Sequence, residues 1–201
     1  MKTPNTSMYV PTIVEKIGNS EKYYDIYSRL FKDRIIFLNT QVDEFSSSSI
    51  VSQLLLLDME SHEDITLLIN SPGGVITNGL AIYGVMQSIV SDVKTIALGE
   101  AASMGAFLLS AGTPGKRFSY ENTRIMIHQP LGGAHGQATD IQIQAKEIQY
   151  LKDKLNLYLA NACNRSVHEV EKATDRDNFL SAQEALNFGL IDKIIYPKEK
   201  Q

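Results

Sequence analysis

Two consecutive segments of the chain repeat one order of features: a short apolar run, a turn of small residues, and a stretch of helix-forming residues. The first runs from 65–69 through Ser71-Pro72-Gly73-Gly74, and the second runs from 93–98 through 99–103. Each segment predicts a strand followed by a helix, and two in succession predict βαβ crossovers in a mostly parallel α/β sheet. Both turns then lie at the carboxyl ends of neighbouring strands, where α/β proteins place their ligands.

The spacing of apolar residues assigns most of the remaining chain. Further strands are expected at 35–38, 115–120, 124–128 and 190–195. Further helices are expected at 25–32, 46–60, 137–161, 166–173 and 181–189, and capping boxes open the last two.

The length of 201 residues fits a single domain, which we place at 21–196. Residues 1–20 lack periodicity and predict a flexible arm, while residues 197–201 predict a frayed tail. The helix at 137–161 keeps an amphipathic pattern over an unusual length. We therefore expect the region 136–162 to project from the body and to offer one face to a partner.

Charge and cysteine content argue against several classes of function. Lys and Arg number 19 against 23 Asp and Glu, for a net charge of −4, and no basic block could neutralise a row of phosphates. No nucleic-acid binding is therefore expected. Cys163 is the only cysteine and lacks spaced His partners, which predicts no disulfide and no zinc site and favours a reducing, cytoplasmic setting. Neither a signal peptide nor an apolar run near the ~18 residues of a membrane span is expected.

Ser103 stands among small residues where the second predicted strand becomes a helix. A serine at such a junction faces the free N–H groups of the helix. That position suits an N-cap, and it equally suits a nucleophile whose substrate oxygen becomes negative beside backbone donors. On local grounds alone, the cap is the commoner use of such a serine.

An acyl-transfer site would also need a base, and the chain holds four histidines. His62 and His168 lie in polar surface segments, and His135 lies in a glycine-rich loop. His128 ends an apolar strand and is followed by Gln129. The residues alone leave both a structural and a catalytic role open for His128.

The residues leave the acid that would orient this base undecided. Asp175 and Asp177 share the polar segment 174–179, and spacing does not choose between them. Gly73 and Gly74 offer a backbone without side chains that could approach a substrate and donate N–H groups, although a structural turn explains them equally well.

Blocks of sequence in one order cover nearly all of the chain. They are Tyr24-Asp25-Ile26-Tyr27-Ser28-Arg29-Leu30, Asn70-Ser71-Pro72-Gly73-Gly74-Val75-Ile76-Thr77, Gly99 to Ala106 with Ala102-Ser103-Met104-Gly105, Ile125-Met126-Ile127-His128-Gln129-Pro130 with Gly136-Gln137-Ala138, Asp175-Arg176-Asp177 with Phe179-Leu180-Ser181-Ala182, and Gly189-Leu190-Ile191-Asp192. Together these blocks resemble the proteolytic subunits of the Clp protease family. The resemblance implies that Ser103 is the nucleophile, His128 its base and Asp177 the orienting acid, with oxyanion-binding N–H groups from Gly74 and Met104.

The resemblance also implies an assembly. The fold would be a crotonase-like α/β spiral, and two seven-membered rings, a tetradecamer, would enclose a chamber for unfolded protein substrates. The helix from about 137 would interlock the rings, Arg176 would be available for an inter-ring ion pair, and the arm 1–20 would form an axial gate that self-processing within 1–8 could shorten. No metal or nucleotide would be needed by this subunit. The chain has no Gly-x-x-x-x-Gly-Lys-Ser/Thr loop, so ATP would be used by a partner AAA+ unfoldase ring.

Some positions depart from the family pattern. Thr66 and Leu68 stand where many relatives have tyrosines that help to build a docking pocket for ATPase loops, leaving Ile96, Phe118 and Tyr120 as apolar candidates. Partner identity therefore stays open, as does the choice between uniform and mixed rings. Two other readings remain: a crotonase-type acyl-CoA enzyme, which would not need Ser103 and His128 together, and a non-catalytic ring subunit.

Overall fold

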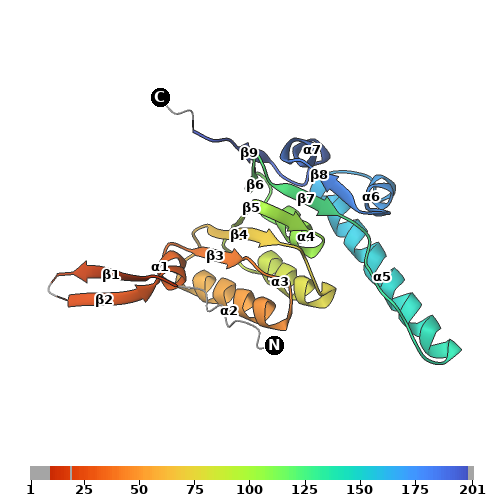
Figure 1. Ribbon diagram of the computed structural model, residues 1–201, viewed down its shortest axis with the longest axis horizontal. Coiled ribbons are helices and arrows are strands. Elements are labelled where there is room, and N and C mark those ends of the chain that lie inside the picture. The colour runs from red at the N-terminus through yellow and green to blue at the C-terminus, as the bar shows by residue number, and fades with distance from the viewer. Residues whose placement is uncertain (1–9, 19, 199–201) are drawn as a thin grey trace, which may run out of the picture.

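The computed structural model describes residues 10–18 and 20–198, which form a mixed α/β fold (Figure 1). The strands are β1 (Thr12–Ile17), β2 (Ser20–Asp25), β3 (Ile35–Leu38), β4 (Ile65–Ser71), β5 (Val93–Ala102), β6 (Arg117–Tyr120), β7 (Arg124–Ile127), β8 (Asn178–Leu180) and β9 (Lys193–Ile195). The helices are α1 (Ile26–Phe31), α2 (Glu44–Glu60), α3 (Ile76–Ser88), α4 (Met104–Ser110), α5 (Ala138–Cys163), α6 (Val167–Thr174) and α7 (Ala182–Phe188).

The main sheet is mostly parallel, as the two repeated strand–turn–helix units predict. Residues 99–102, expected in the second turn, instead continue β5, because 100–102 pair with β7, and only Ser103 separates β5 from α4. Its path runs β3-β4-β5-β6-β9, and every neighbouring pair on that path is parallel. The long strand β5 has two partners on the same side, because its first half pairs with β6 and its last residues, Glu100 to Ala102, pair with β7. The α/β prediction is thus confirmed, while the crotonase-like spiral and the domain limits stay predictions.

The core lies between the sheet and the helices α2, α3 and α4. Each residue of α4 is buried, and α2 and α3 lie side by side beneath β3 and β4 (Figure 1). Strand β4 buries Ile65, Leu67 and Ile69 completely. Removing such apolar side chains from water stabilises the fold by about 25 cal/mol per Å² of buried area, and this packing holds the carboxyl ends of β4 and β5 in place.

Local capping chemistry sets several helix boundaries. The capping boxes expected at Ser166 and Ser181 are both present, each with a glutamate at the third helical position. Helix α2 begins at Glu44, earlier than the expected start at residue 46, because Asp43 accepts from the Ser46 N–H and Ser46 Oγ accepts in return.

The segment 12–17, expected to lack regular structure, instead forms β1. It pairs with β2 in an antiparallel hairpin from Thr12↔Asp25 to Ile17↔Ser20, and Gly18 takes a φ of 61° at the turn. Glu15 forms ion pairs with Arg29 of α1 and with Lys32, the residue that follows α1, and these tie the hairpin to the body. Residues 1–9, where the rest of the expected arm lies, and residue 19 are outside the described residues.

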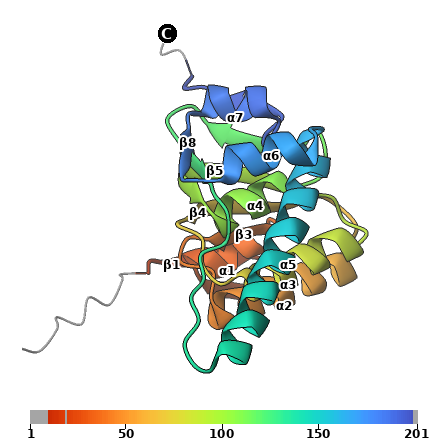
Figure 2. The same ribbon diagram turned by 90° about the vertical axis from the view of Figure 1, so that its right-hand side faces the viewer.

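Helix α5 is the long helix that apolar periodicity predicts, and it spans 26 residues. Its buried residues, Leu155, Asn156, Leu159, Ala160 and Cys163, all lie in the C-terminal part. The N-terminal part extends away from the rest of the molecule (Figures 1 and 2). Within 10–18 and 20–198, no helix combines the length and the apolar character that crossing a bilayer requires.

Candidate active site

Ser103 occupies the turn between β5 and α4 with a backbone conformation that non-glycine residues rarely adopt. Its φ is 52° and its ψ is −120°, which costs a residue with a side chain on the order of 1–3 kcal/mol. The turn is held by the Ser103 N–H, which donates to Met126 O over 2.8 Å. Backbone strain of this kind clusters at functional sites.

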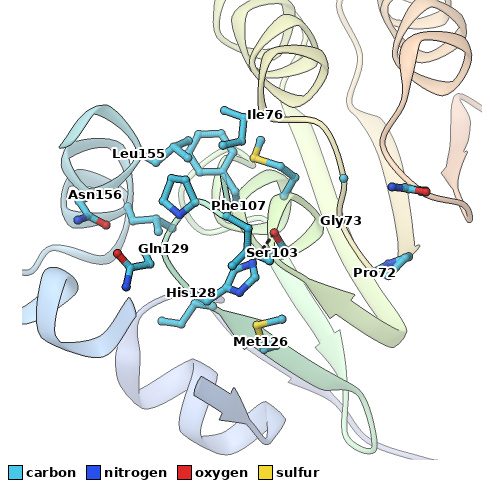
Figure 3. A pocket seen from close by; sticks show the side chains of 17 residues that line it. Pro72, Gly73, Ile76, Ser103, Phe107, Met126, His128, Gln129, Leu155 and Asn156 are labelled. Carbon is cyan, nitrogen blue, oxygen red and sulfur yellow. Dashed lines mark hydrogen bonds between the residues drawn. The ribbon is translucent and has the colours of Figure 1, made fainter. Parts of the chain in front are cut away.

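The Ser103 hydroxyl does not cap α4, although the serine stands at the N-cap position. Its side chain makes no capping hydrogen bond within the part of the chain that the structure describes. Its Oγ instead lies 2.9 Å from Nε2 of His128 (Figure 3). The capping role that the sequence favours for Ser103 is therefore not seen.

Strand register brings His128 to Ser103. Because β5 and β7 are parallel neighbours with Ala102 opposite Met126, the residues that follow both strands emerge at one edge of the sheet. His128 comes directly after β7, and its side chain is 12% exposed. The ring is thus held at the carboxyl ends of the strands, as the sequence pattern predicts for a ligand site.

A strand that sequence reasoning missed brings Asp177 to the other side of this ring. Strand β8 pairs antiparallel with β7, with Asn178 opposite Ile127. Continuing this register by one position places Asp177 opposite His128, and Asp177 Oδ1 lies 2.9 Å from His128 Nδ1. The carboxylate is 62% exposed, so water reaches one side of this contact.

The neighbours of Asp177 have different surroundings. Asp175 caps the C-terminus of α6, and its backbone oxygen accepts from Gln129 Nε2 over 2.6 Å. Arg176 is exposed and donates from Nη1 to the same oxygen over 3.3 Å. Of the two aspartates that spacing left open, the structure therefore brings Asp177 to the histidine, and it leaves the Arg176 guanidinium facing outward.

The glycine turn after β4 packs against the serine. Gly73 has a φ of 91°, and a Cβ built on it would lie 2.6 Å from Ser103 Cβ and 2.8 Å from Met104 N. No side chain fits between the two turns. Met104 is the first residue of α4, so its N–H has no partner within the helix. The backbone of Gly73 and the Met104 N–H thus meet beside Ser103, and Gly74 lines the same pocket.

A pocket of about 290 Å³ opens next to Ser103 and His128 (Figure 3). Apolar side chains make up most of its wall: Ile76, Met104, Phe107, Met126, Leu131, Leu155 and Leu159. Gln41, Gln129 and Asn156 add polar groups. The periodicity of the helix at 137–161 marks Leu155 and Leu159 as buried, but no sequence signal shows that they face a pocket, because that depends on how α5 packs across α4.

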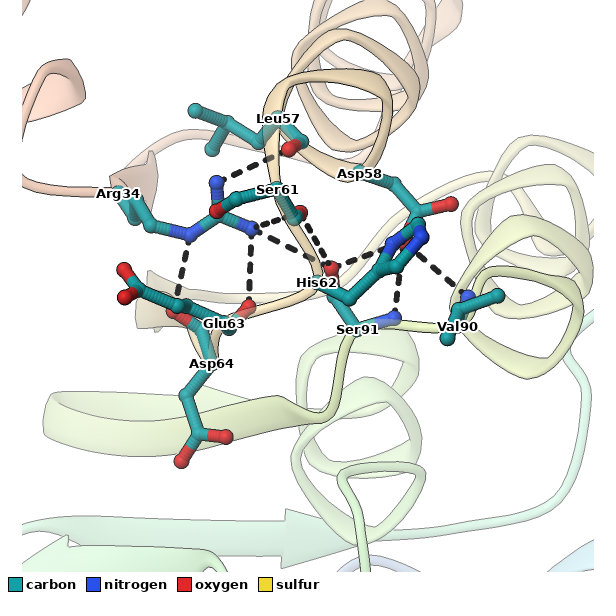
Figure 4. Close-up of polar contacts among 9 residues, drawn as sticks. All are labelled: Arg34, Leu57, Asp58, Ser61, His62, Glu63, Asp64, Val90 and Ser91. Atoms are coloured by element: carbon teal, nitrogen blue, oxygen red, sulfur yellow. Dashed lines mark hydrogen bonds and ion pairs between the residues drawn. The ribbon is translucent and has the colours of Figure 1, made fainter.

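The remaining histidines lie elsewhere. His135 and His168 are exposed. His62 follows α2, and its Nδ1 lies 3.4 Å from Asp58 Oδ1 in a polar cluster that also includes Arg34 and Ser91 (Figure 4). Asp58 and Arg34 bind backbone groups there, which gives the cluster a structural explanation.

A mixed α/β chain with serine, histidine and aspartate in hydrogen-bonded series at the carboxyl edge of its sheet has the arrangement of a hydrolase. The model of the Clp protease family matches residues 18–198. The chain therefore belongs to the Clp protease family, and this membership implies peptidase activity of the Clp type.

Proposed function

We propose that the chain is a serine endopeptidase subunit in which Ser103, His128 and Asp177 act as a catalytic triad. The observation that carries this proposal is the continuous series of two 2.9 Å contacts, from Ser103 Oγ to His128 Nε2 and from His128 Nδ1 to Asp177 Oδ1. The strained backbone at Ser103 supports it, because that conformation presents the hydroxyl to the pocket instead of to the helix end.

The chemistry follows from these positions. His128 Nε2 accepts the hydroxyl proton as Ser103 Oγ attacks a peptide carbonyl carbon, and Asp177 stabilises the resulting imidazolium. The peptide C–N bond then breaks as His128 returns the proton to the leaving amine. Water then attacks the acyl carbon as His128 accepts its proton, and the bond from that carbon to Ser103 Oγ breaks as His128 returns the proton to Oγ. No cofactor or metal enters these steps.

The carbonyl oxygen becomes negative during both attacks, and we assign its stabilisation to the N–H groups of Gly74 and Met104. The loss of one such donor typically lowers kcat by about 10²- to 10³-fold. The adjoining pocket supports binding of a large apolar side chain on the acyl side of the cut bond, because its wall is mostly apolar.

The wider assembly is part of the same proposal. Members of this family generally assemble into rings with an unfoldase, so we propose two stacked heptameric rings of a crotonase-like fold, fed with unfolded proteins by an ATP-driven AAA+ partner in the cytoplasm. Ile141, Ile143 and Tyr150 are exposed on the projecting part of α5. They would contact the opposite ring, near which Arg176 would form its ion pair.

A fluorophosphonate probe tests the catalytic assignment. The wild-type assembly should be labelled on Ser103, and Ser103→Ala should abolish both labelling and peptide cleavage while the native mass of the ring stays unchanged. Ser119→Ala is the matched control, because Ser119 is buried in β6. This variant should still be labelled on Ser103 to the wild-type extent. If the wild-type protein stays unlabelled with and without an ATPase partner, the peptidase assignment fails and a non-catalytic ring subunit becomes the better description.

A further inference from the structure

The glycine turn, Gly73-Gly74, is held by backbone hydrogen bonds to Val42 that the proposed mechanism does not use. The Val42 N–H donates to Gly73 O, and the Val75 N–H donates to Val42 O, each over 2.8 Å. A trans peptide group points its C=O and its N–H in opposite directions. Because Gly73 O faces Val42, the N–H of the same peptide group, which belongs to Gly74, faces away from Val42.

Facing away from Val42, the Gly74 N–H points toward Ser103. The turn lies between the backbone of Val42 on one side and the Ser103 turn on the other, since a Cβ on Gly74 would overlap Val42 O and a Cβ on Gly73 would lie 2.6 Å from Ser103 Cβ. Gly74 and Ser103 line the same pocket. The contacts at Val42 therefore set the orientation of the Gly74 N–H relative to the Ser103 hydroxyl.

One side chain, that of Ser71, hydrogen-bonds both to the segment that precedes Val42 and to the glycine turn. Ser71, the last residue of β4, is fully buried. Its hydroxyl donates to Thr40 O over 2.6 Å and accepts from the Gly73 N–H over 3.2 Å. One hydroxyl can do both, because it carries one proton and two lone pairs. Ser71 thus ties the segment leading to Val42 to the glycine turn itself.

We infer that Ser71 is a positioning residue for the oxyanion-binding N–H of Gly74, an inference that rests on the proposed peptidase function. Ser71 is fully buried and is not among the residues that line the pocket, so it acts only through the turn. Replacing it by alanine leaves the buried Gly73 N–H without its partner and breaks the link to Thr40 O. The turn can then rotate, and misplacement of a catalytic group by about 1 Å can lower the rate about 10²-fold.

Steady-state cleavage of a fluorogenic peptide by the assembled wild-type protein and by Ser71→Ala tests this inference. We expect kcat to fall about 10- to 100-fold with KM changed less than about threefold, because the N–H of Gly74 acts mainly on the transition state. Ser119→Ala is the matched control: Ser119 is also fully buried, and its hydroxyl donates to Tyr120 O over 3.0 Å. That variant should keep wild-type kcat, even if its thermal unfolding midpoint drops as much as that of Ser71→Ala.

Ser71→Cys provides a second variant, because sulfur fills the space of the hydroxyl while hydrogen-bonding more weakly. It should fold and show a smaller loss of kcat than the alanine variant. An unchanged kcat in either folded Ser71 variant, or a rise in KM alone, overturns the inference about Ser71. Absence of cleavage and of fluorophosphonate labelling in the wild-type protein would instead overturn the proposed function, so the two failures are distinguishable.

Discussion

Asp177→Asn should slow peptide cleavage far less than the corresponding change slows a serine protease with a buried triad, where kcat falls about 10⁴-fold. In a buried triad, the asparagine NH₂ faces the histidine and enforces the wrong tautomer. Here Asp177 is 62% exposed, and among the described residues only His128 hydrogen-bonds to its carboxylate. The new amide can therefore rotate and present its oxygen to His128 Nδ1.

The variant then loses only the attraction between the negative charge of Asp177 and the imidazolium of His128. Two unit charges 4 Å apart interact by about 1 kcal/mol in water and about 4 kcal/mol near a protein surface. The exposure of Asp177 places this contact near the lower value, at about 1–2 kcal/mol, which corresponds to about a 5- to 30-fold loss in kcat. Asp177→Ala also removes the hydrogen bond that orients the ring, so it should lose about 10²- to 10³-fold.

The assay is kcat for a fluorogenic peptide, measured for both variants as assembled rings. Thermal unfolding serves as the folding control and should change little, because the side chain is largely exposed. If Asp177→Asn is as slow as Asp177→Ala or slower, then the amide donates to His128 Nδ1 and the reasoning from exposure is refuted.

Two further predictions concern groups outside the site. Arg117 is buried and binds Asp192 through Nε and Nη2, over 2.9 and 2.6 Å, so Asp192→Ala should lower the free energy of unfolding by about 3–5 kcal/mol in denaturant titrations; a change below 1 kcal/mol would contradict this. Burial raises the pKa of Asp192, but hydrogen bonds from Arg117 outweigh burial and leave that pKa below its ordinary value. The Asp192 carboxylate therefore contributes its full stabilisation of the fold above the unfolded-state pKa of about 3.9, and this stabilisation is lost as pH falls through the folded-state pKa. Burial raises the pKa of the Cys163 thiol to about 11, so at pH 8 iodoacetamide should modify it only after denaturation, and rapid modification of the folded protein would show that the thiol is accessible.

The two strand–turn–helix units were predictable because each couples an apolar run to a turn of small residues. Strands joined by such βαβ crossovers run parallel, so their carboxyl ends, and with them both turns, lie at one edge of the sheet. The position of Ser103 follows from this argument. Its backbone strain does not, because a positive φ at a serine depends on tertiary contacts, such as the bond from its N–H to Met126 O.

The short strand β8 could not be predicted in the same way. It has only three residues, and its central Phe179 is exposed, so it shows neither the length nor the apolar alternation that marks a strand. Apolar periodicity does not predict the hairpin of β1 and β2 for a related reason. The hairpin is exposed, and cross-strand backbone pairing and charged contacts stabilise it. Sequence patterns report burial, and these elements bury little.

The missed strand determines which acid meets the histidine. Side chains alternate between the two faces of a strand, so a slip of β8 by one residue against β7 would bring Arg176 or Asn178 opposite His128 and would turn Asp177 to the other face. The approach of Ser103 to His128 likewise depends on the register of Ala102 with Met126. The distances of the series are therefore set by two strand ladders, and residues that hold those ladders in register influence the site without lining it.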